Sequence, residues 1–388
     1  MSGLGLYLGF EQNQNQYKYQ WKIPNTVGLV SMPNGITFSC ASTRTAQTSP
    51  STLLTGIGAN QAVVSYNAYL DVYGLQHEAT ARNYQIYSEA LQSWGVQSGG
   101  VISTGNADPS SGTNATLVAG NSVGSQFIAQ ALPSLSAANG LTTTSWIRGF
   151  NGTPNQADWC YGAAAVPQIL NCEFPTPSLL WQRKSVSATN AGSVTGCTLA
   201  YSGVYNVGSN GQNNKAYYYG IQIETGLIPT SYIPTTTAAT TRAASTISAP
   251  IANRLNFKCR FDLYVHNRTD YGTDSKTVFQ DTSGTNKLLI YISTGTGVLE
   301  TTKLTMLIDG VQVYVGTNPY PFVAGEKWSW RLTFDGTTYS CQVYKNDVLQ
   351  WIESYTGAAP SSLTGIYFGS GISGINHWNS QVTFIGAT

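Results

Sequence analysis

The sequence predicts an all-β protein built from antiparallel β-sandwich or jelly-roll domains in tandem. Short strand-length runs recur along the chain between clusters of Gly, Asn, Ser and Pro, which is typical of sandwiches rather than of βαβ units. Two Asp-Gly pairs join alternating apolar and polar runs, and this is the strongest short-range signal of a hairpin. The chain holds 40 glycines and many threonines, which are poor helix formers, so a helical protein is disfavoured.

The first region, residues 1–85, is expected to be β-rich and to serve in docking or oligomerisation. In "GITFSCAST", Ile36, Phe38 and Cys40 alternate with polar or small residues, which predicts a strand with one buried face. Residues 61–76, rich in Val and Tyr, predict a further strand.

The second region, residues 86–236, is predicted to be a jelly roll. It begins near the best helix-like stretch of the chain, around residues 87–94, which Gly95 ends. Strand-length runs follow, among them "ATLVAG", "SQFIAQAL", "TTTSWIRGF" and "AYYYGIQIET". Residues 237–250 contain only one large apolar residue, so they are expected to form a linker or an extended crossing strand.

The third region, residues 251–388, is predicted to be an antiparallel sandwich. In "EKWSWRLTFDGTTYSCQVYKNDVLQW", the apolar residues from Trp328 to Phe334 alternate with polar ones, and Asp335–Gly336 turns the chain into a return strand. Asp309–Gly310 joins two further strands in the same way. Consecutive hairpins of this kind bury one face of each sheet.

Charge and cysteine usage disfavour several classes of protein. Only 10% of residues are charged, the net charge is +1 and no basic run occurs, so a nucleic-acid groove is not expected. No apolar run is long enough for a membrane span, and the first residues do not resemble a secretory signal. The six cysteines lack C-x-x-C spacing and the three histidines are far apart, so we expect buried free thiols and no zinc site.

Catalytic motifs are missing from the sequence, and we predict no enzyme and no cofactor. No convincing nucleophile elbow, phosphate-binding loop or EF-hand is present. Most acids lie beside turns, where local hydrogen bonds explain them. Glu224 is different because it lies within a strand, and we expect it to form a structural ion pair with Arg82 or Arg242 rather than to act in catalysis.

The stretch "YYYGIQIETGLIPTSYIPTTTAATTRAAS", residues 217–245, resembles a recurrent element of tailed-phage structural proteins. There a strand of the form G-x-Q-[IL]-E precedes "P-T-S-Y-I-P-T", and "T-R-A-A" follows. Two upstream pieces are similar to the same family in the same order. "GITFSCASTRTA" resembles its "ITFTRASTAT" strand, and "GLQHEATARNYQIYSEALQSW" resembles its "GLLIEPARTNLLLYSEQFDNAAW". Here Ser39 and Cys40 depart from the family pattern, and Gln76 and His77 interrupt its apolar pair.

The resemblance covers residues 35–245 and points to head-spike fibre and tail-associated proteins of phages and gene transfer agents. It implies that residues 86–236 are a carbohydrate-binding-like jelly roll and that the stretch 217–245 is its last strand and exit. Residues 251–388 resemble the concanavalin-A/laminin-G sandwiches that often follow. Such sandwiches sometimes hold Ca²⁺ at a loop rim, for which Asp270 and Asp274 are the candidate ligands, and Ca²⁺ is the one cofactor left open.

Glycan binding uses aromatic faces under the sugar ring, with amides and carboxylates bonding its hydroxyls. Three segments mix aromatics with Asn, Gln and Gly in loop contexts, although core packing also explains any single aromatic side chain of a sandwich. Their candidate residues are Tyr205, Asn210, Gln212, Asn213, Asn214 and Tyr217 in the first segment, Trp159 and Tyr161 in the second, and His377 and Trp378 in the third.

The expected function is that of a phage virion structural protein on the particle surface: a head fibre or spike, a capsid decoration or a tail adhesin. It would bind host-surface polysaccharide, contact other capsid or tail proteins, and assemble in the host cytoplasm. By analogy with the family it would be a homo-oligomer, a trimer most often. The alternatives are a capsid cement protein without receptor binding and, less favoured, a polysaccharide depolymerase.

Overall fold

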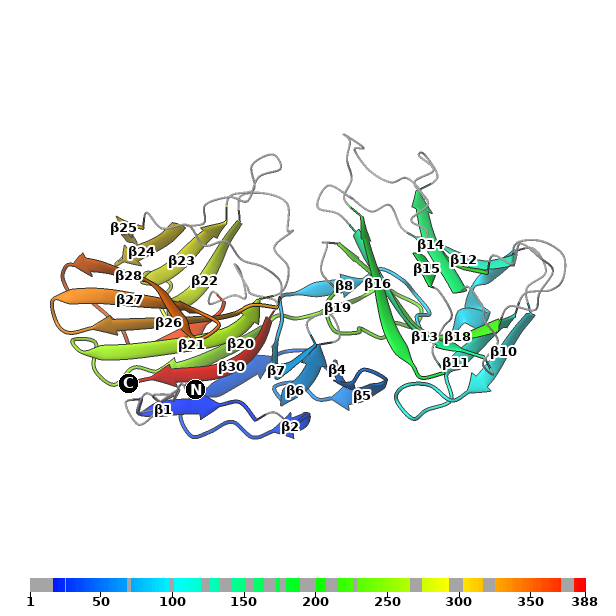
Figure 1. Cartoon of the computed structure of the whole chain (residues 1–388), viewed down its shortest axis with the longest axis horizontal. Helices are drawn as coiled ribbons and strands as arrows, with labels where there is room; N and C mark the ends of the chain where they lie inside the picture. The colour runs from blue at the N-terminus through cyan, green and yellow to red at the C-terminus, as the bar shows by residue number, and fades with distance from the viewer. Residues whose placement is uncertain are drawn as a thin grey trace, which may run out of the picture.

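The structure is a computed structural model, and it shows two β-rich lobes joined at a narrow middle (Figure 1). The residues it describes are 17–24, 26–67, 71–97, 101–119, 126–132, 141–150, 157–163, 172–174, 179–188, 200–206, 215–225, 229–265, 274–292, 303–316, 325–370 and 380–388. Every strand pairing recorded among them is antiparallel, as the sequence predicts for an all-β chain.

One lobe is a sandwich of two large sheets, and we call it the terminal lobe because segments near both ends of the chain form it. Its first sheet has nine strands, in the order β2-β6-β7-β30-β21-β26-β27-β28 with β1 also on β30. These strands are β1 (Tyr19–Lys22), β2 (Gly28–Val30), β6 (Ala62–Asn67), β7 (Val72–His77), β21 (Phe257–Val265), β26 (Lys327–Phe334), β27 (Thr338–Lys345), β28 (Val348–Thr356) and β30 (Ser380–Ala387).

The second sheet of the terminal lobe has seven strands, in the order β25-β24-β23-β22-β29-β20-β3. They are β3 (Thr37–Cys40), β20 (Ser245–Pro250), β22 (Asp274–Asp281), β23 (Lys287–Ile292), β24 (Lys303–Ile308), β25 (Val311–Val315) and β29 (Gly365–Phe368). One hydrophobic core lies between the sheets. It combines Phe38 and Leu75 from the N-terminal part with Phe261, Trp330 and Phe368 from the C-terminal part.

The other lobe consists of two five-stranded sheets, and we call it the inserted lobe because it lies between β7 and β20 in the chain (Figure 1). Its first sheet has the order β10-β11-β18-β13-β16, with β10 (Val101–Asn106), β11 (Ala115–Ala119), β13 (Leu141–Gly149), β16 (Gln182–Ala188) and β18 (Lys215–Thr225). Its second has the order β15-β14-β17-β12-β9, with β9 (Gly95–Gln97), β12 (Gln126–Leu132), β14 (Ala157–Ala163), β15 (Cys172–Phe174) and β17 (Ala200–Asn206).

The chain enters and leaves the inserted lobe through two strands that pair with each other. They are β8 (Ala81–Asn83) on the way in and β19 (Thr240–Arg242) on the way out, with Thr241 opposite Arg82. The hairpin of β4 (Arg44–Ser49) and β5 (Thr52–Ile57) lies at the same junction. Leu53 of this hairpin packs with Trp146 and Tyr219 of the inserted lobe, so apolar contacts also join the two lobes.

The observed pairing differs from the expected division into regions 1–85, 86–236, 237–250 and 251–388. Most strands before residue 78, namely β1, β2, β3, β6 and β7, complete the two sheets of the C-terminal sandwich, while β4 and β5 form a separate two-stranded sheet. Within the expected linker, β20 pairs with β3 on one side and β29 on the other, so the crossing-strand alternative describes it better. Ile247 explains this placement, because its side chain is fully buried in the core of the sandwich.

Several local predictions can be compared directly with the structure. Ile36, Phe38 and Cys40 are buried while Thr37 and Ser39 are exposed, which confirms the alternating strand. Residues 61–76 form the β6–β7 hairpin instead of one strand. The helix-like stretch at 87–94 contains only the short 3-10 helix η2 (Leu91–Ser93), the one helical element among the described residues. Tyr87 interrupts it with a φ of +51° and donates its N–H to Thr236.

The Asp-Gly hairpins are confirmed, and the buried thiols are confirmed for three of the six cysteines; the side chains at positions 160, 172 and 197 are not among those that the structure describes. Asp309 and Gly310 have φ angles of +47° and +80° and connect β24 to β25, as a primed turn requires. Trp328, Trp330, Leu332 and Phe334 are all buried on one face of β26. Cysteines 40, 259 and 341 are free and buried. No helix able to span a membrane is found in the described part of the chain.

Candidate functional site

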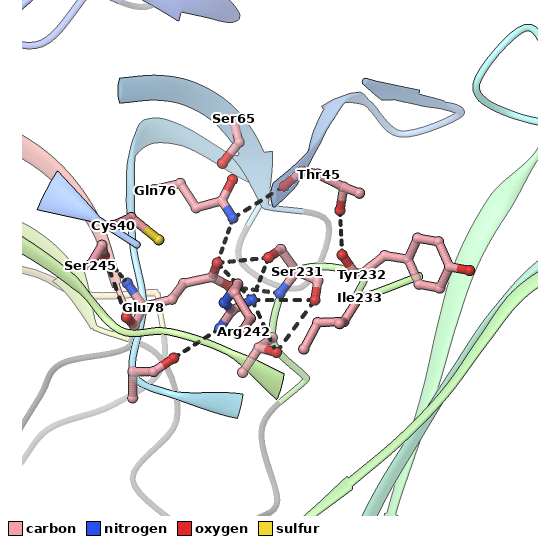
Figure 2. Close-up of polar contacts among 12 residues, drawn as sticks. Cys40, Thr45, Ser65, Gln76, Glu78, Ser231, Tyr232, Ile233, Arg242 and Ser245 are labelled. Carbon is pink, nitrogen blue, oxygen red and sulfur yellow. Dashed lines mark hydrogen bonds and ion pairs between the residues drawn. The ribbon is translucent and has the colours of Figure 1, made fainter. Parts of the chain in front are cut away.

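A buried polar network joins the two lobes next to the paired strands β8 and β19 (Figure 2). At its centre Arg242 forms an ion pair with Glu78, with 3.1 Å between Nη1 and Oε2. The side chain of Arg242 is 1% exposed and that of Glu78 is 12% exposed. The pair therefore depends on surrounding hydrogen bonds to offset the cost of removing two charges from water.

Those hydrogen bonds are present around Glu78. Ser231 donates its backbone N–H to Oε1 at 2.6 Å and its hydroxyl to Oε2 at 2.7 Å. Gln76 donates its side-chain amide to Oε2 as well. Burial raises the pKa of Glu78, but the charge of Arg242 and the hydrogen bonds from Gln76 and Ser231 outweigh it, so this pKa lies below its usual value.

The side chain of Arg242 also bonds to both the entering and the leaving segment of the chain. Its Nη2 donates to the carbonyl of Ala79 at 2.9 Å, and its Nη1 donates to the hydroxyl of Ser231 at 2.5 Å. One guanidinium thus contacts the segment just before β8, where the chain enters the inserted lobe, and the segment between β18 and β19, where it leaves. This is the fork-like use of several donors that lysine cannot reproduce.

Glu224 lies beside this network, but it does not pair with Arg242 or Arg82, so that prediction is wrong. Its carboxylate accepts hydrogen bonds from the backbone N–H of Thr230 at 2.8 Å, from the Thr230 hydroxyl at 2.7 Å and from Gln222 at 2.9 Å. Thr230 stands between Glu224 and Arg242, and the arginine is already engaged with Glu78. Arg82 instead lies over the ring of Tyr84, at 5.2 Å from its centroid.

The electrostatic state of Glu224 differs from that of Glu78. Burial raises the pKa of Glu224, and the hydrogen bonds from Thr230 and Gln222 together with the charge of Arg183 do not reverse this. Two carboxylates on neighbouring segments therefore have pKa values that are displaced in opposite directions.

Strand β18 and the segment after it are fastened by side chains of alternating residues. Gln222 accepts the N–H of Ile233 at 2.7 Å, and its amide nitrogen donates to Glu224. Two residues earlier, Gly220 forms a bulge, since β18 has one residue more than β13 between two matched pairs. Its φ is +62°, and a Cβ there would lie 3.1 Å from the ring of Tyr232, so glycine suits both the turn and the close approach.

The segment 83–89 completes the network from the other side. Asn83 uses its full hydrogen-bonding capacity: its oxygen accepts the N–H of Ile223 and Gln85, and its nitrogen donates to the carbonyls of Ile221 and Ile233. The Ser88 hydroxyl lies 2.7 Å from that of Tyr232, which also donates to Glu89 at 3.1 Å. The residues that carry the phage-protein resemblance are thus brought together from distant segments, and these hydrogen bonds fasten residues 83–89 to β18 and to the segment after it.

A cavity of about 240 Å³ lies at this junction. Its walls come from β6 and β7 of the terminal lobe, from β13 and β16 of the inserted lobe, and from residues 229–232. Three lining residues carry a buried polar atom without a hydrogen-bond partner in the described structure. They are Oε1 of Gln76, Nε1 of Trp146 and Nε of Arg183. Since buried polar atoms are normally paired, this cavity is the candidate binding site of the molecule.

The orientation of the Gln76 amide is fixed by its neighbours. Its nitrogen donates to the carbonyl of Thr45 at 3.2 Å and to the carboxylate of Glu78, and both of these groups only accept. The amide oxygen is therefore turned away from Glu78, toward the side of Ser65 (Figure 2). Gln76 is 2% exposed, so a free acceptor is held at the wall of the cavity.

The structure describes only part of the predicted glycan-binding set. Positions 210, 212, 213, 214, 377 and 378 lie outside the described residues. Only the backbones of Trp159, Tyr161 and Tyr205 are described, on the neighbouring strands β14 and β17, where Tyr205 is opposite Asp158. Tyr217 belongs to the other sheet of the inserted lobe. It is half-buried, with the Arg148 guanidinium 4.4 Å from its ring centroid, so it is partly committed to local packing.

The candidate Ca²⁺ ligands are not brought together by any described contact. Position 270 lies outside the described residues, and Asp274 is the first residue of β22, of which only the backbone is described. Within the described part of the chain, no group of three or more His, Cys, Asp or Glu side chains is placed to hold a metal ion.

Sequence reasoning missed the residues of the cavity. In the sequence, Gln76 stands out only because it interrupts an apolar pair, Trp146 is part of a strand-length run, and nothing singles out Arg183. The site depends on the pairing of Trp146 with Arg183 across β13 and β16, which places an indole and a guanidinium on one face. That register is a long-range property of the sheet and is not encoded locally.

Comparison with protein-family models finds no match, and comparison with curated proteins finds none either. Among solved structures, sheep galectin-11 in complex with glycerol aligns with 36% of this chain and 96% of its own, at 10% identity and a TM-score of 0.24. GH43B of the xyloglucan PUL of Bacteroides ovatus aligns with 93% of this chain and 100% of its own, at 10% identity and a TM-score of 0.26. At these scores neither alignment carries a statement about this chain.

Proposed function

We propose that this protein is a phage virion structural protein displayed on the particle surface, as a head fibre or spike, a capsid decoration or a tail adhesin, and that it binds host-surface glycans. The proposal rests on one observation, which is that two segments distant in sequence meet at the lobe junction. The residues that resemble phage structural proteins, in segments 78–89 and 220–242, are used there as one hydrogen-bonded joint. A shared joint between lobes is what a family of structural proteins would retain.

The chemistry of the joint supports a structural use over a catalytic one. Hydrolysis of a glycosidic bond by two carboxylates needs one group free to donate or take a proton and a second placed across the bond. Both oxygens of Glu78 and both of Glu224 are already occupied by donors. On this basis we propose that the protein is not an enzyme.

The outer edges of the terminal lobe support contacts with other proteins of the particle or with further copies of this chain. Strands β25 and β28 each end a sheet, and their exposed apolar residues include Val311, Val348 and Ile352. An edge strand with exposed apolar side chains is a typical site for pairing with another chain. Multiple copies on a particle would also raise the effective affinity for a repeating glycan.

The test combines location with binding. Antibody labelling or a reconstruction of intact particles should place the chain on the outside, and the purified chain should bind host cells saturably in competition with soluble host polysaccharide. Location on the particle without any cell binding would instead support the cement alternative. Release of new reducing ends from the polysaccharide would support a depolymerase, and absence from the particle would contradict the proposal altogether.

A further inference from the structure

We propose that the cavity at the lobe junction binds a single acidic sugar residue, a monosaccharide unit that carries both a carboxylate and hydroxyl groups. This inference deepens the glycan-binding part of the proposed function and rests on it for its biological context. The predicted glycan residues do not include the groups that form this site. The inference of an acidic sugar follows from the geometry and chemistry of the cavity.

The cationic side of the site is Arg183. It makes two hydrogen bonds, both through Nη2, to the Thr144 hydroxyl at 3.1 Å and the Thr230 carbonyl at 2.7 Å. Both acceptors are neutral, and Nε has no hydrogen-bond partner in the described structure. Burial lowers the pKa of Arg183, against the charges of Glu224 and Glu78, which raise it. A guanidinium edge with donors to spare is the group that recognises a carboxylate in a fixed orientation.

The nearby carboxylates do not accept a hydrogen bond from the unpartnered Nε of Arg183. Glu78 is paired with Arg242 and accepts three further hydrogen bonds, so its lone pairs are used. Glu224 accepts three hydrogen bonds from Thr230 and Gln222. Trp146 is fully buried, and its unpartnered indole N–H is a second donor that requires an acceptor.

The third unpartnered atom excludes an anion without an O–H group, such as sulfate, as a complete ligand. The amide oxygen of Gln76 is an acceptor, so the ligand must also present a donor. A carboxylate offers acceptors to Arg183 and Trp146, while a hydroxyl can donate to Gln76. A hydroxylated carboxylate satisfies all three groups, and neither a neutral alkyl chain nor a sulfate ion does.

The size and lining of the cavity fit one sugar residue. Its volume of about 240 Å³ lies just below the range of roughly 300–1,000 Å³ that is typical of small-molecule sites, so it suits a ligand of the size of one sugar residue. Leu53, Tyr66 and Pro229 supply apolar wall for the C–H face of a ring. Ser185 at the cavity is exposed, which leaves a path to solvent.

The experiment titrates the full chain with four small probes and follows binding by calorimetry or ligand-observed NMR. D-glucuronate and D-galacturonate test the proposed class. D-glucose has the hydroxyls but no carboxylate, and cyclohexanecarboxylate has a ring and a carboxylate but no hydroxyls. We expect saturable binding of at least one uronate, at least about tenfold tighter than either of the other two probes.

Two variants assign the binding to the cavity. Arg183→Gln removes the guanidinium, and Trp146→Phe removes only the indole N–H while keeping an aromatic ring. Each should weaken uronate binding, by at least about tenfold for Arg183→Gln. Arg254→Gln, at an exposed arginine of the terminal lobe, is the matched control and should bind as the wild type does. Because Arg183 also holds Thr230, the thermal midpoint of each variant is measured first.

The inference is overturned if neither uronate binds, if the uronates bind no better than glucose, or if a folded Trp146→Phe and a folded Arg183→Gln both bind normally. Its failure is separable from failure of the proposed function, because the titration needs no particle and no cell. A chain found on particles that binds host cells but ignores all four probes would keep the proposed function and exclude this site.

Discussion

Arg242 and Glu78, which are distant in sequence, form an ion pair of 3.1 Å at the point where the chain enters and leaves the inserted lobe. Ser231 bonds to both partners, so the pair and the segment after β18 are one unit. The joint therefore couples the stability of the two lobes, and each of its parts can be tested separately.

The two buried carboxylates should show opposite pH dependence. The pKa of Glu78 is lowered in the folded protein, so its stabilisation is complete above the unfolded value of about 4.3 and is lost as the pH falls through the folded pKa. The pKa of Glu224 is raised, so its contribution is complete below the unfolded pKa and is lost as the pH rises through the folded one.

Unfolding free energies of Glu78→Gln and Glu224→Gln should therefore be measured by denaturation at several pH values between about 3 and 7. The cost of Glu78→Gln should grow as the pH rises, and the cost of Glu224→Gln should shrink. Slopes of the same sign for both variants would show that the two carboxylates do not have the environments described above.

Asn83 should be intolerant even of an isosteric change. Asn83→Asp removes the donors to the carbonyls of Ile221 and Ile233 and buries a charge, so we expect a loss of at least about 2 kcal/mol in unfolding free energy. Asn253→Asp is the matched control, because Asn253 is exposed and uses only its side-chain oxygen, on Leu255. It should stay within about 0.5 kcal/mol of the wild type. Equal losses of unfolding free energy in the two variants would show that Asn83 does not stabilise the joint.

The bulge at Gly220 should combine backbone strain with a steric contact. Gly220→Ala would place a Cβ at positive φ and 3.1 Å from the ring of Tyr232, and we expect a cost of about 2–4 kcal/mol in chemical denaturation. Gly105 also has a positive φ, +76°, but a Cβ there meets nothing within 4 Å. Gly105→Ala should therefore cost only about 1 kcal/mol in unfolding free energy. A similar cost at both positions would mean that the ring of Tyr232 moves aside without a measurable loss of stability.

The buried thiols should be inert in the folded protein. Cys40, Cys259 and Cys341 are buried, and burial raises the pKa of the Cys259 and Cys341 thiols, so little reactive thiolate forms. Peptide mapping after maleimide treatment should find these three cysteines unlabelled in the native chain and labelled after unfolding. Rapid native labelling of Cys259 would contradict its position in the core.

The sequence was sufficient for features that depend on neighbouring residues. The alternation of Ile36, Phe38 and Cys40 follows from the two-residue repeat of a strand, and Asp309–Gly310 follows from the positive φ angles of a hairpin turn. The insertion of one lobe into the other could not be predicted in this way. An alternating strand reveals which face is buried but not which strand lies beside it. The pairing of β1 with β30 therefore could not be predicted from the residues of either strand.

The same limit applies to the candidate site. Glu224 was recognisable as an unusual acid within a strand, but its partner depended on where Thr230 and Arg242 lie after folding. Gln76, Trp146 and Arg183 become a site only because two lobes meet around them.

The most direct test of the joint is scanning calorimetry of the full chain and of Arg242→Gln, with Arg254→Gln as the control. If the network couples the lobes, the wild type and the control unfold in one transition. Arg242→Gln then loses about 3–5 kcal/mol and unfolds in two resolved steps, because a buried charge is left alone and the lobes separate energetically. A single transition for Arg242→Gln at the wild-type temperature would contradict the proposal that these residues hold the two lobes together.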